Sequence, residues 1–209
     1  MDIIYGGSFD PPHKGHERFV ELMLARFPNA AVHLLPCFQS VQKGPAHATA
    51  ENRLGMVQAM AHQWPGRVRV DSREIAAAAP KPTIDTLVEW RQEMGREASL
   101  VFALGGDSLA RLDTWVRWTE LLEWVHLLVL PRPGWDHELP PLVQARLQGR
   151  WLTEGEWDRL RRTAGGHALV LPGKALPFAS SEIRQSRAKL ADAVPESVLN
   201  YIEQNELFR

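Results

Sequence analysis

Short apolar runs alternate with longer segments of helical periodicity along most of this chain. The apolar runs predict strands, because buried strands of a parallel sheet are apolar on both faces; they cover residues 2–5, 31–35, 67–71, 99–104, 125–130 and 167–171. After the first run, apolar side chains recur three and four positions apart, which predicts an amphipathic helix; its apolar face is Phe19, Val20, Met23, Leu24 and Phe27.

Four further segments carry helix signals. Thr49 is a favourable N-cap residue and precedes an apolar face made of Leu54, Val57, Met60 and Ala61. Thr83 is expected to begin the next helix, with Ile84, Leu87, Val88 and Met94 on its apolar face. Two helices are expected near residues 181–190 and 195–207, and residues 135–166 are expected to be helical in part.

This alternation of strands and helices predicts an α/β fold with a doubly wound, mostly parallel sheet of about six strands and helices on both faces. We expect one domain over residues 1–209, with residues 172–209 as a helical extension. Ligands of such sheets bind at the carboxyl ends of the strands. Glycine-rich or polar segments follow four of the strands, at residues 6–16, 43, 105–107 and 132–134, so they are expected at that edge.

Composition narrows the classes of partner. The 209 residues carry a net charge of −1, with 44% hydrophobic and 23% charged residues, so neither nucleic acid nor an anionic membrane is expected to bind. The single cysteine, Cys37, fits a reducing compartment, and neither a signal peptide nor a membrane span is apparent. A cytoplasmic protein is therefore expected.

The first strand runs into the segment GGSFDPPHKGH, residues 6–16, which precedes the first helix. A strand, a glycine turn and a helix N-terminus make a site for phosphate, because backbone N–H groups converge there. The segment is neither the dinucleotide fingerprint nor a P-loop. His13 and His16 allow three interpretations: a metal pair, acid–base catalysis, or two donors to phosphate oxygens. The flanking glycines favour the third, and no metal site is expected.

The segment resembles the G-[TS]-F-D-P-x-H-x-G-H signature of the nucleotidyltransferase superfamily, in the variant found in bacterial nicotinate mononucleotide adenylyltransferases. The resemblance continues along most of the chain. TIDTL (83–87), GGDSL (105–109), LDTWVRW (112–118) and RPG (132–134) match family segments, and FASSEIR (178–184) is similar to the family's I-S-S-T-x-I-R. Of the family's P-H-K segment, VQK (41–43) retains only the lysine, and KP (81–82) replaces a serine and a tyrosine.

The resemblance implies a Rossmann-like nucleotidyltransferase that transfers the adenylyl group of ATP to nicotinate mononucleotide by direct attack, giving nicotinate adenine dinucleotide and pyrophosphate in NAD biosynthesis. Mg²⁺ would enter with the ATP phosphates. The implied catalytic residues are His13, His16, Lys43 and Arg184. The implied ATP-binding residues are these four with Gly6, Gly7, Ser8, Phe9, Gly105, Asp107, Ser180 and Ser181. The implied mononucleotide-binding residues are Thr83, Thr86, Asp107, Trp115 and Arg132.

Three alternatives remain at this point. Nicotinamide mononucleotide could be the preferred acceptor, because the departure at residues 81–82 lies near the segment that reads the pyridine ring. Pantetheine-phosphate adenylyltransferases belong to the same superfamily but are shorter and lack the TIDTL and Gly-Asp…Trp segments. A nucleotide-binding module without catalysis is disfavoured, because both histidines, Lys43, Asp107 and Arg184 are all present. The oligomeric state cannot be predicted from the sequence.

Overall fold

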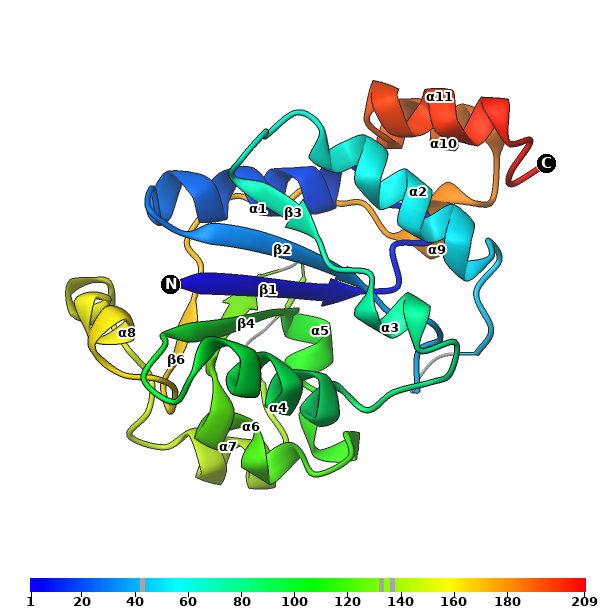
Figure 1. The fold of residues 1–209 in the computed structure, drawn as a ribbon. Helices are drawn as coiled ribbons and strands as arrows, with labels where there is room; N and C mark the ends of the chain where they lie inside the picture. Colours follow the sequence, from blue (N-terminus) through cyan, green and yellow to red (C-terminus); the bar gives the residue numbers. More distant parts are fainter. Residues whose placement is uncertain (42–43, 132–133, 136–137) are drawn as a thin grey trace. The chain divides into compact units, whose positions relative to one another are not determined.

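The structure is a computed structural model that describes residues 1–41, 44–131, 134–135 and 138–209. Six strands form one sheet in the order β3-β2-β1-β4-β5-β6 (Figure 1). They are β1 (Asp2–Gly7), β2 (Ala31–Pro36), β3 (Val68–Val70), β4 (Leu100–Gly105), β5 (His126–Leu130) and β6 (Ala168–Val170). The pairs β1–β4, β2–β3, β4–β5 and β5–β6 are parallel. The predicted α/β fold with a parallel six-stranded sheet is confirmed.

The chain divides into two compact units, and each is made of two separate stretches of sequence. The first unit comprises Met1–Tyr5 and Pro82–Gly173, and the second comprises Gly6–Lys81 and Lys174–Arg209. The GGSFDPPHKGH segment and the C-terminal helices therefore belong to the same unit. That the whole chain acts as one domain stays a prediction.

The second unit contains β2, β3 and the helices α1 (Lys14–Arg26), α2 (Ala50–Ala61), α3 (Arg73–Ala76), α9 (Ser180–Ile183), α10 (Arg187–Ala193) and α11 (Glu196–Gln204). α1 and α2 pack on β2, and α11 packs on α2. The α11 contact depends on Gly55, because a Cβ there would collide with the Tyr201 ring and hydroxyl. The Tyr201 hydroxyl donates to Asn52 Oδ1 at 3.4 Å, which adds a polar contact between the two helices.

The first unit contains residues 2–5 of β1 together with β4, β5 and β6; β1 pairs with β4, β4 pairs with β5, and β5 pairs with β6. Its helices are α4 (Thr83–Met94), α5 (Gly106–Leu109), α6 (Leu121–Trp124), α7 (Pro141–Leu147) and α8 (Asp158–Arg162), with 3₁₀ turns at Leu112–Thr114, Trp118–Glu120 and Glu154–Glu156. α5 contacts β4 and β5, and α6 contacts α4 and β5. The expectation of partial helix in residues 135–166 is confirmed for the described residues.

Two buried polar side chains hold the loops that lead into β4, β5 and β6. Arg91 donates to the carbonyls of Ala98 at 2.5 Å, Ala164 at 2.7 Å and Trp124 at 3.1 Å. His126 is fully buried; its Nε2 lies 2.9 Å from the Thr163 carbonyl, and its Nδ1 accepts from the His167 N–H at 3.2 Å. The two imidazoles are stacked, with centroids 5.4 Å apart and planes 3° apart.

These two hydrogen bonds assign the protonation of His126. Nδ1 accepts, so the proton sits on Nε2 and the ring is neutral. Burial, as the largest cause, lowers the pKa of His126 from 6.5 to about 4, and the nearby charges of His167 and Arg91 act in the same direction.

Two expectations about helices are corrected, and one is confirmed. The helix expected at residues 181–190 is two helices, α9 and α10, because Ser186 is extended and caps α10 by accepting from the Lys189 N–H at 3.2 Å. The expectation that Thr83 begins a helix is confirmed, because Thr83 is the first residue of α4 and Pro82 is the N-cap. Met94, assigned to the apolar face of α4, is 41% exposed, whereas Arg91 is buried.

Within the described residues no helix is long and apolar enough to cross a membrane.

Candidate functional site

The GGSFDPPHKGH segment makes a tight turn between β1 and α1. Phe9 has φ 48°, in the left-handed region, and its side chain is buried with the ring 4.9 Å from that of His16. A Cβ at Gly7 would lie 3.0 Å from the Phe9 ring, so glycine there lets the ring cover the end of the strand. The bond between Asp10 and Pro11 is cis. The turn is thus a packed structure, in which side chains as well as backbone fix its course.

His13 and His16 form a reciprocal cap on α1. His13 is the N-cap residue, and its Nδ1 accepts from the Gly15 N–H at 3.1 Å. His16 Nδ1 accepts from the His13 N–H at 3.1 Å. A larger residue would not fit at position 15, because a Cβ there would lie 2.8 Å from His13 Nδ1. The sequence predicted two histidines at a helix N-terminus but not that they cap it.

The cap determines what the two rings can do. Both Nδ1 atoms are acceptors, so each neutral ring carries its proton on Nε2. The rings lie 3.8 Å apart between centroids, and both residues are buried. A pair of fixed Nε2–H donors suits an anionic oxygen acceptor. It does not suit a general base, whose ring nitrogen must be free to take a proton.

Arg184 and Ser180, at α9, contact the same turn. Ser180 Oγ donates to the Pro11 carbonyl at 3.0 Å. Arg184 Nη1 donates to the Asp10 carbonyl and lies 3.5 Å from Asp10 Oδ2. Arg184 Nε is buried and has no hydrogen-bond partner among the described residues. The structure therefore brings Arg184 and Ser180 to the turn that carries both histidines, while Ser181 is exposed.

Arg53 of α2 was missed by the sequence reasoning, which placed Leu54 on the buried face. The Arg53 side chain is fully buried, and Nη1 donates to the carbonyls of Ser8 at 2.9 Å and Cys37 at 2.6 Å. It also donates to Phe38 and, at 3.4 Å, to Ala48. One signal was available: Arg53 lies four residues before Val57, in line with the buried face of the helix.

Cys37 follows β2 and lies beside the turn. Its N–H donates to the Gly7 carbonyl at 3.0 Å, and its Sγ lies 3.9 Å from Ser8 Oγ. Burial raises the pKa of the Cys37 thiol above its ordinary value, although the Arg53 charge acts against this. A thiol held in the neutral form is a poor nucleophile, so the site offers no activated cysteine.

Other predicted residues lie in the first unit. Gly105 is the N-cap of α5, and Asp107 is in its first turn. Trp115 is half-buried and meets Phe102 edge-on, with centroids 6.2 Å apart. Thr83 begins α4 and is half-buried, whereas Thr86 is fully buried.

Trp135 was not predicted as part of a site. Its indole lies against the backbone at Gly106, where a Cβ would be 2.5 Å from the ring. Two predicted residues, Lys43 and Arg132, lie outside the described residues.

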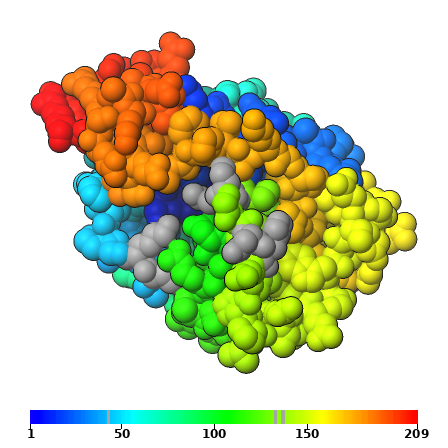
Figure 2. Space-filling view, turned by 180° about the vertical axis from the view of Figure 1, so that it is seen from behind, coloured from blue at the N-terminus to red at the C-terminus, as the bar shows by residue number. Residues whose placement is uncertain are grey.

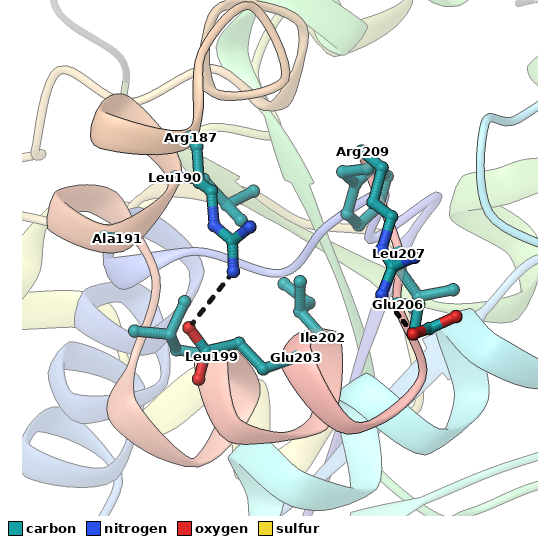
Figure 3. A pocket seen from close by; sticks show the side chains of 10 residues that line it. Arg187, Leu190, Ala191, Leu199, Ile202, Glu203, Glu206, Leu207 and Arg209 are labelled. Atoms are coloured by element: carbon teal, nitrogen blue, oxygen red, sulfur yellow. Dashed lines mark ion pairs between the residues drawn. The ribbon is translucent and has the colours of Figure 1, made fainter.

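One pocket lies away from these residues, between α10, α11 and the C-terminus. These helices are exposed on the face in Figure 2 (orange to red), and Figure 3 shows aliphatic side chains pointing into the pocket. Ion pairs join Arg187 to Glu203, at 3.8 Å, and Arg209 to Glu206. The volume of the pocket is about 70 Å³, well below the roughly 300–1,000 Å³ of ordinary ligand sites. It is therefore not a candidate for a nucleotide.

The matching family model is the one for cytidylyltransferase-like proteins, and it matches residues 4–196. The chain belongs to the cytidylyltransferase-like family. The match takes in the GGSFDPPHKGH segment, the strands up to β6 and α9, so every residue predicted for the site falls within the family region.

Curated relatives are similar to this chain over nearly their whole length. A probable nicotinate-nucleotide adenylyltransferase of Chromobacterium violaceum is 39% identical over 215 residues, covering 99% of this chain and 97% of the relative. One of Marinomonas sp. (strain MWYL1) is 37% identical over 209 residues, covering 99% and 93%. Among solved structures, the Plasmodium falciparum nicotinic acid mononucleotide adenylyltransferase complexed with NaAD has a TM-score of 0.73 at 15% identity, covering 99% and 96%. At that identity the likeness shows the fold.

Proposed function

We propose that this protein is a nicotinate-nucleotide adenylyltransferase of NAD biosynthesis. A phosphate oxygen of nicotinate mononucleotide attacks the α-phosphorus of ATP, the bond from that phosphorus to the bridging oxygen breaks, and pyrophosphate leaves. The product is nicotinate adenine dinucleotide. Relatives of 31–39% identity over 99% or more of this chain carry the name of this activity, and the motif residues are those that the reaction needs.

The observation that carries the proposal is the pair of fixed donors at the start of α1. His13 and His16 each hold an Nε2–H through the reciprocal cap, and the Nε of Arg184 is a buried donor beside the same turn. Transfer of an adenylyl group needs no protein nucleophile, because positioning and stabilisation of charge on the phosphates supply most of the rate. Donors held in place before the reaction serve that purpose.

We assign the residues of the second unit to the ATP phosphates. His13, His16 and Arg184 donate to phosphate oxygens, and His16 stabilises the charge that develops on the α-phosphate. Gly6, Gly7, Ser8 and Phe9 shape the turn, and Lys43 adds positive charge. The Ser180 hydroxyl already donates a hydrogen bond to the Pro11 carbonyl, so we assign this residue to holding α9 on the turn. The exposed Ser181 is then the hydroxyl that donates to the nucleotide.

We assign the residues of the first unit to the nucleoside part of ATP and to the second substrate. Gly105 is the last residue of β4 and Asp107 follows it, where the strand order reverses beside β1. Such switch points are the usual ligand sites of these sheets. The Trp115 indole offers a flat face to the pyridine ring, and we assign Thr83 and Arg132 to the same substrate. Thr86 is fully buried, so its part would be in the wall of the site. The assignment requires the two units to act as one catalytic domain.

ATP is a substrate in this proposal, and Mg²⁺ would enter on its phosphates. Within the described residues no three histidine, cysteine or acidic side chains form a metal cluster. The donors at the turn are N–H groups, which fit phosphate oxygens and leave the ion to phosphate and water ligands. The ion would neutralise the leaving pyrophosphate. Because the reaction consumes ATP, we place it in the cytoplasm.

The test is pyrophosphate release from ATP with one acceptor at a time: nicotinate mononucleotide, nicotinamide mononucleotide and pantetheine phosphate. We expect the highest kcat/KM with nicotinate mononucleotide. Preference for nicotinamide mononucleotide would keep the chemistry and reassign the acceptor, and the replacement of Ser-Tyr by Lys81-Pro82 makes this the comparison to run first. ATP binding without release for any acceptor would favour the non-catalytic module instead.

A further inference from the structure

Asp10 is a buried carboxylate within the turn, between the glycines and the two histidines. The residue is 5% exposed. Its Oδ2 accepts from the His47 N–H at 2.8 Å, and its Oδ1 accepts from the Ala48 N–H at 3.0 Å. Both oxygens are therefore used to hold the backbone just before the N-cap of α2, which is Thr49.

Asp10 also holds Arg184. The Nη1 of Arg184 lies 3.5 Å from Asp10 Oδ2 and donates to the Asp10 carbonyl, so one guanidinium nitrogen is fixed by both groups of the same residue. This leaves Arg184 Nε buried beside the turn without a partner among the described residues. The pair is largely shielded, with side-chain exposures of 19% and 7%. In such surroundings the attraction of the two charges is much stronger than in water.

Arg53 completes the arrangement from the other side. It donates to the carbonyls of Ser8 and Cys37 and, through Nε, to Ala48. Ala48 thus gives its N–H to the Asp10 anion and its carbonyl to the Arg53 cation. The two buried charges are joined through one residue, and the segment between Cys37 and Ala48, which includes Lys43 in sequence, is held at both ends.

We propose that Asp10 is a positioning residue that holds Arg184 and the His47–Ala48 backbone in place for the ATP phosphates. The inference rests on the proposed function in that ATP is taken as the ligand. Asp10 adds a negative charge near an anion site, which by itself would weaken phosphate binding. Its two N–H bonds and the Arg184 contact offset that charge, and the gain is that Arg184 need not be ordered when ATP binds.

The experiment compares ATP and AMP binding by calorimetry in the full-length protein and its Asp10→Asn variant. An amide keeps the size of the side chain but loses the charge, and it presents one N–H₂ group where the backbone already donates. We expect the Kd for ATP to rise at least about tenfold and that for AMP much less, if Arg184 donates to the β- and γ-phosphates, which AMP lacks. In turnover, the KM for ATP should rise while the KM for nicotinate mononucleotide changes less than about twofold, because Arg184 is assigned to ATP and not to the mononucleotide.

Two matched controls separate positioning from general stability. Asp71→Asn alters a carboxylate of the same type, whose oxygens accept from Arg73 N at 3.0 Å and pair with Arg73 Nε at 2.6 Å. It should leave ATP affinity unchanged. His47→Ala removes a 62% exposed imidazole whose Nδ1 lies 3.5 Å from Asp10 Oδ2, but it keeps the N–H that donates to Asp10. Because the Arg184 contact and both backbone bonds of Asp10 remain, ATP affinity should again be retained.

Three results would overturn the inference: unchanged ATP affinity in Asp10→Asn, an equal loss for AMP and ATP, or the same loss in Asp71→Asn. In an Arg184→Gln background the effect of Asp10→Asn should shrink, since the contact is already lost. If Asp10→Asn does not fold, Asp10→Ser gives the same comparison. Wild-type protein that binds ATP but releases no pyrophosphate would overturn the proposed function alone, whereas wild-type protein that does not bind ATP would overturn both.

Discussion

His126 makes the stability of the fold depend on pH below neutrality. The neutral ring is held between the Thr163 carbonyl and the His167 N–H, and protonation of Nδ1 would turn that acceptor into a donor facing another donor. The pKa of His126 is about 4 in the folded protein, against 6.5 for the free side chain, chiefly because of burial. The unfolded chain therefore binds a proton more readily than the folded one between these values.

The sign and size of the change in stability with pH follow from this difference in the pKa of His126. Stability from His126 is complete above pH 6.5 and is lost as the pH falls toward 4, because the unfolded state takes up the proton first. Each pKa unit corresponds to about 1.4 kcal/mol, so the full loss is about 3 kcal/mol, of which about 2 kcal/mol is already lost at pH 5. For a chain of this size that should move the urea midpoint by roughly 1 M.

The assay is urea unfolding at pH 7 and pH 5, followed by tryptophan fluorescence, for wild type, His126→Gln and His62→Gln. His62 is exposed, so its variant should show the wild-type pH dependence. His126→Gln should be less stable at pH 7 but lose less on going to pH 5. An equal pH dependence in wild type and His126→Gln would refute the reasoning, as would a titration midpoint near 6.5 for His126 by NMR. The NMR measurement does not depend on whether the variant folds.

Three other experiments test separate parts of the structure. Gly55→Ala should destabilise the protein by about 1–3 kcal/mol through collision with Tyr201, and Tyr201→Phe should recover part of this in the double variant; additive effects in urea unfolding would contradict the contact. His16→Ala should lower pyrophosphate release about 10²–10³-fold or more with a native circular dichroism spectrum, whereas a near-normal rate would refute its role. Cys37 should react with iodoacetamide at pH 7.5 much more slowly than free cysteine, and Cys37→Ser should retain turnover; rapid alkylation would contradict the raised pKa.

The sequence predicted much of the fold because strand burial and helix periodicity are local signals. All six strands lie where apolar runs predicted them, with ends that differ by a few residues, and Thr49 caps α2 through the Asn52 N–H as expected. The break between α9 and α10 was missed because Ser186 is compatible with a helix interior as well as with a cap. Its extended backbone becomes evident only in the folded chain.

The details of the candidate site were less predictable, because they rest on contacts between distant residues. Periodicity treats arginine as a solvated residue, so it could not assign Arg53 or Arg91 to backbone carbonyls of other segments. The motif resemblance selected His13 and His16 without indicating that each caps the same helix. Similarly, it named Ser180 without showing that the hydroxyl is used by Pro11.

The contacts of α9 with the turn have a consequence for biosynthesis of the protein. Ser180 and Arg184 reach residues that lie 169 and 174 positions earlier in the chain. On the ribosome the GGSFDPPHKGH segment is therefore made long before its partners Ser180 and Arg184. A nascent chain stalled before residue 174 would hold both histidines and lack Arg184 altogether. If Arg184 binds ATP as proposed, ATP binding would be acquired only after translation has passed this residue.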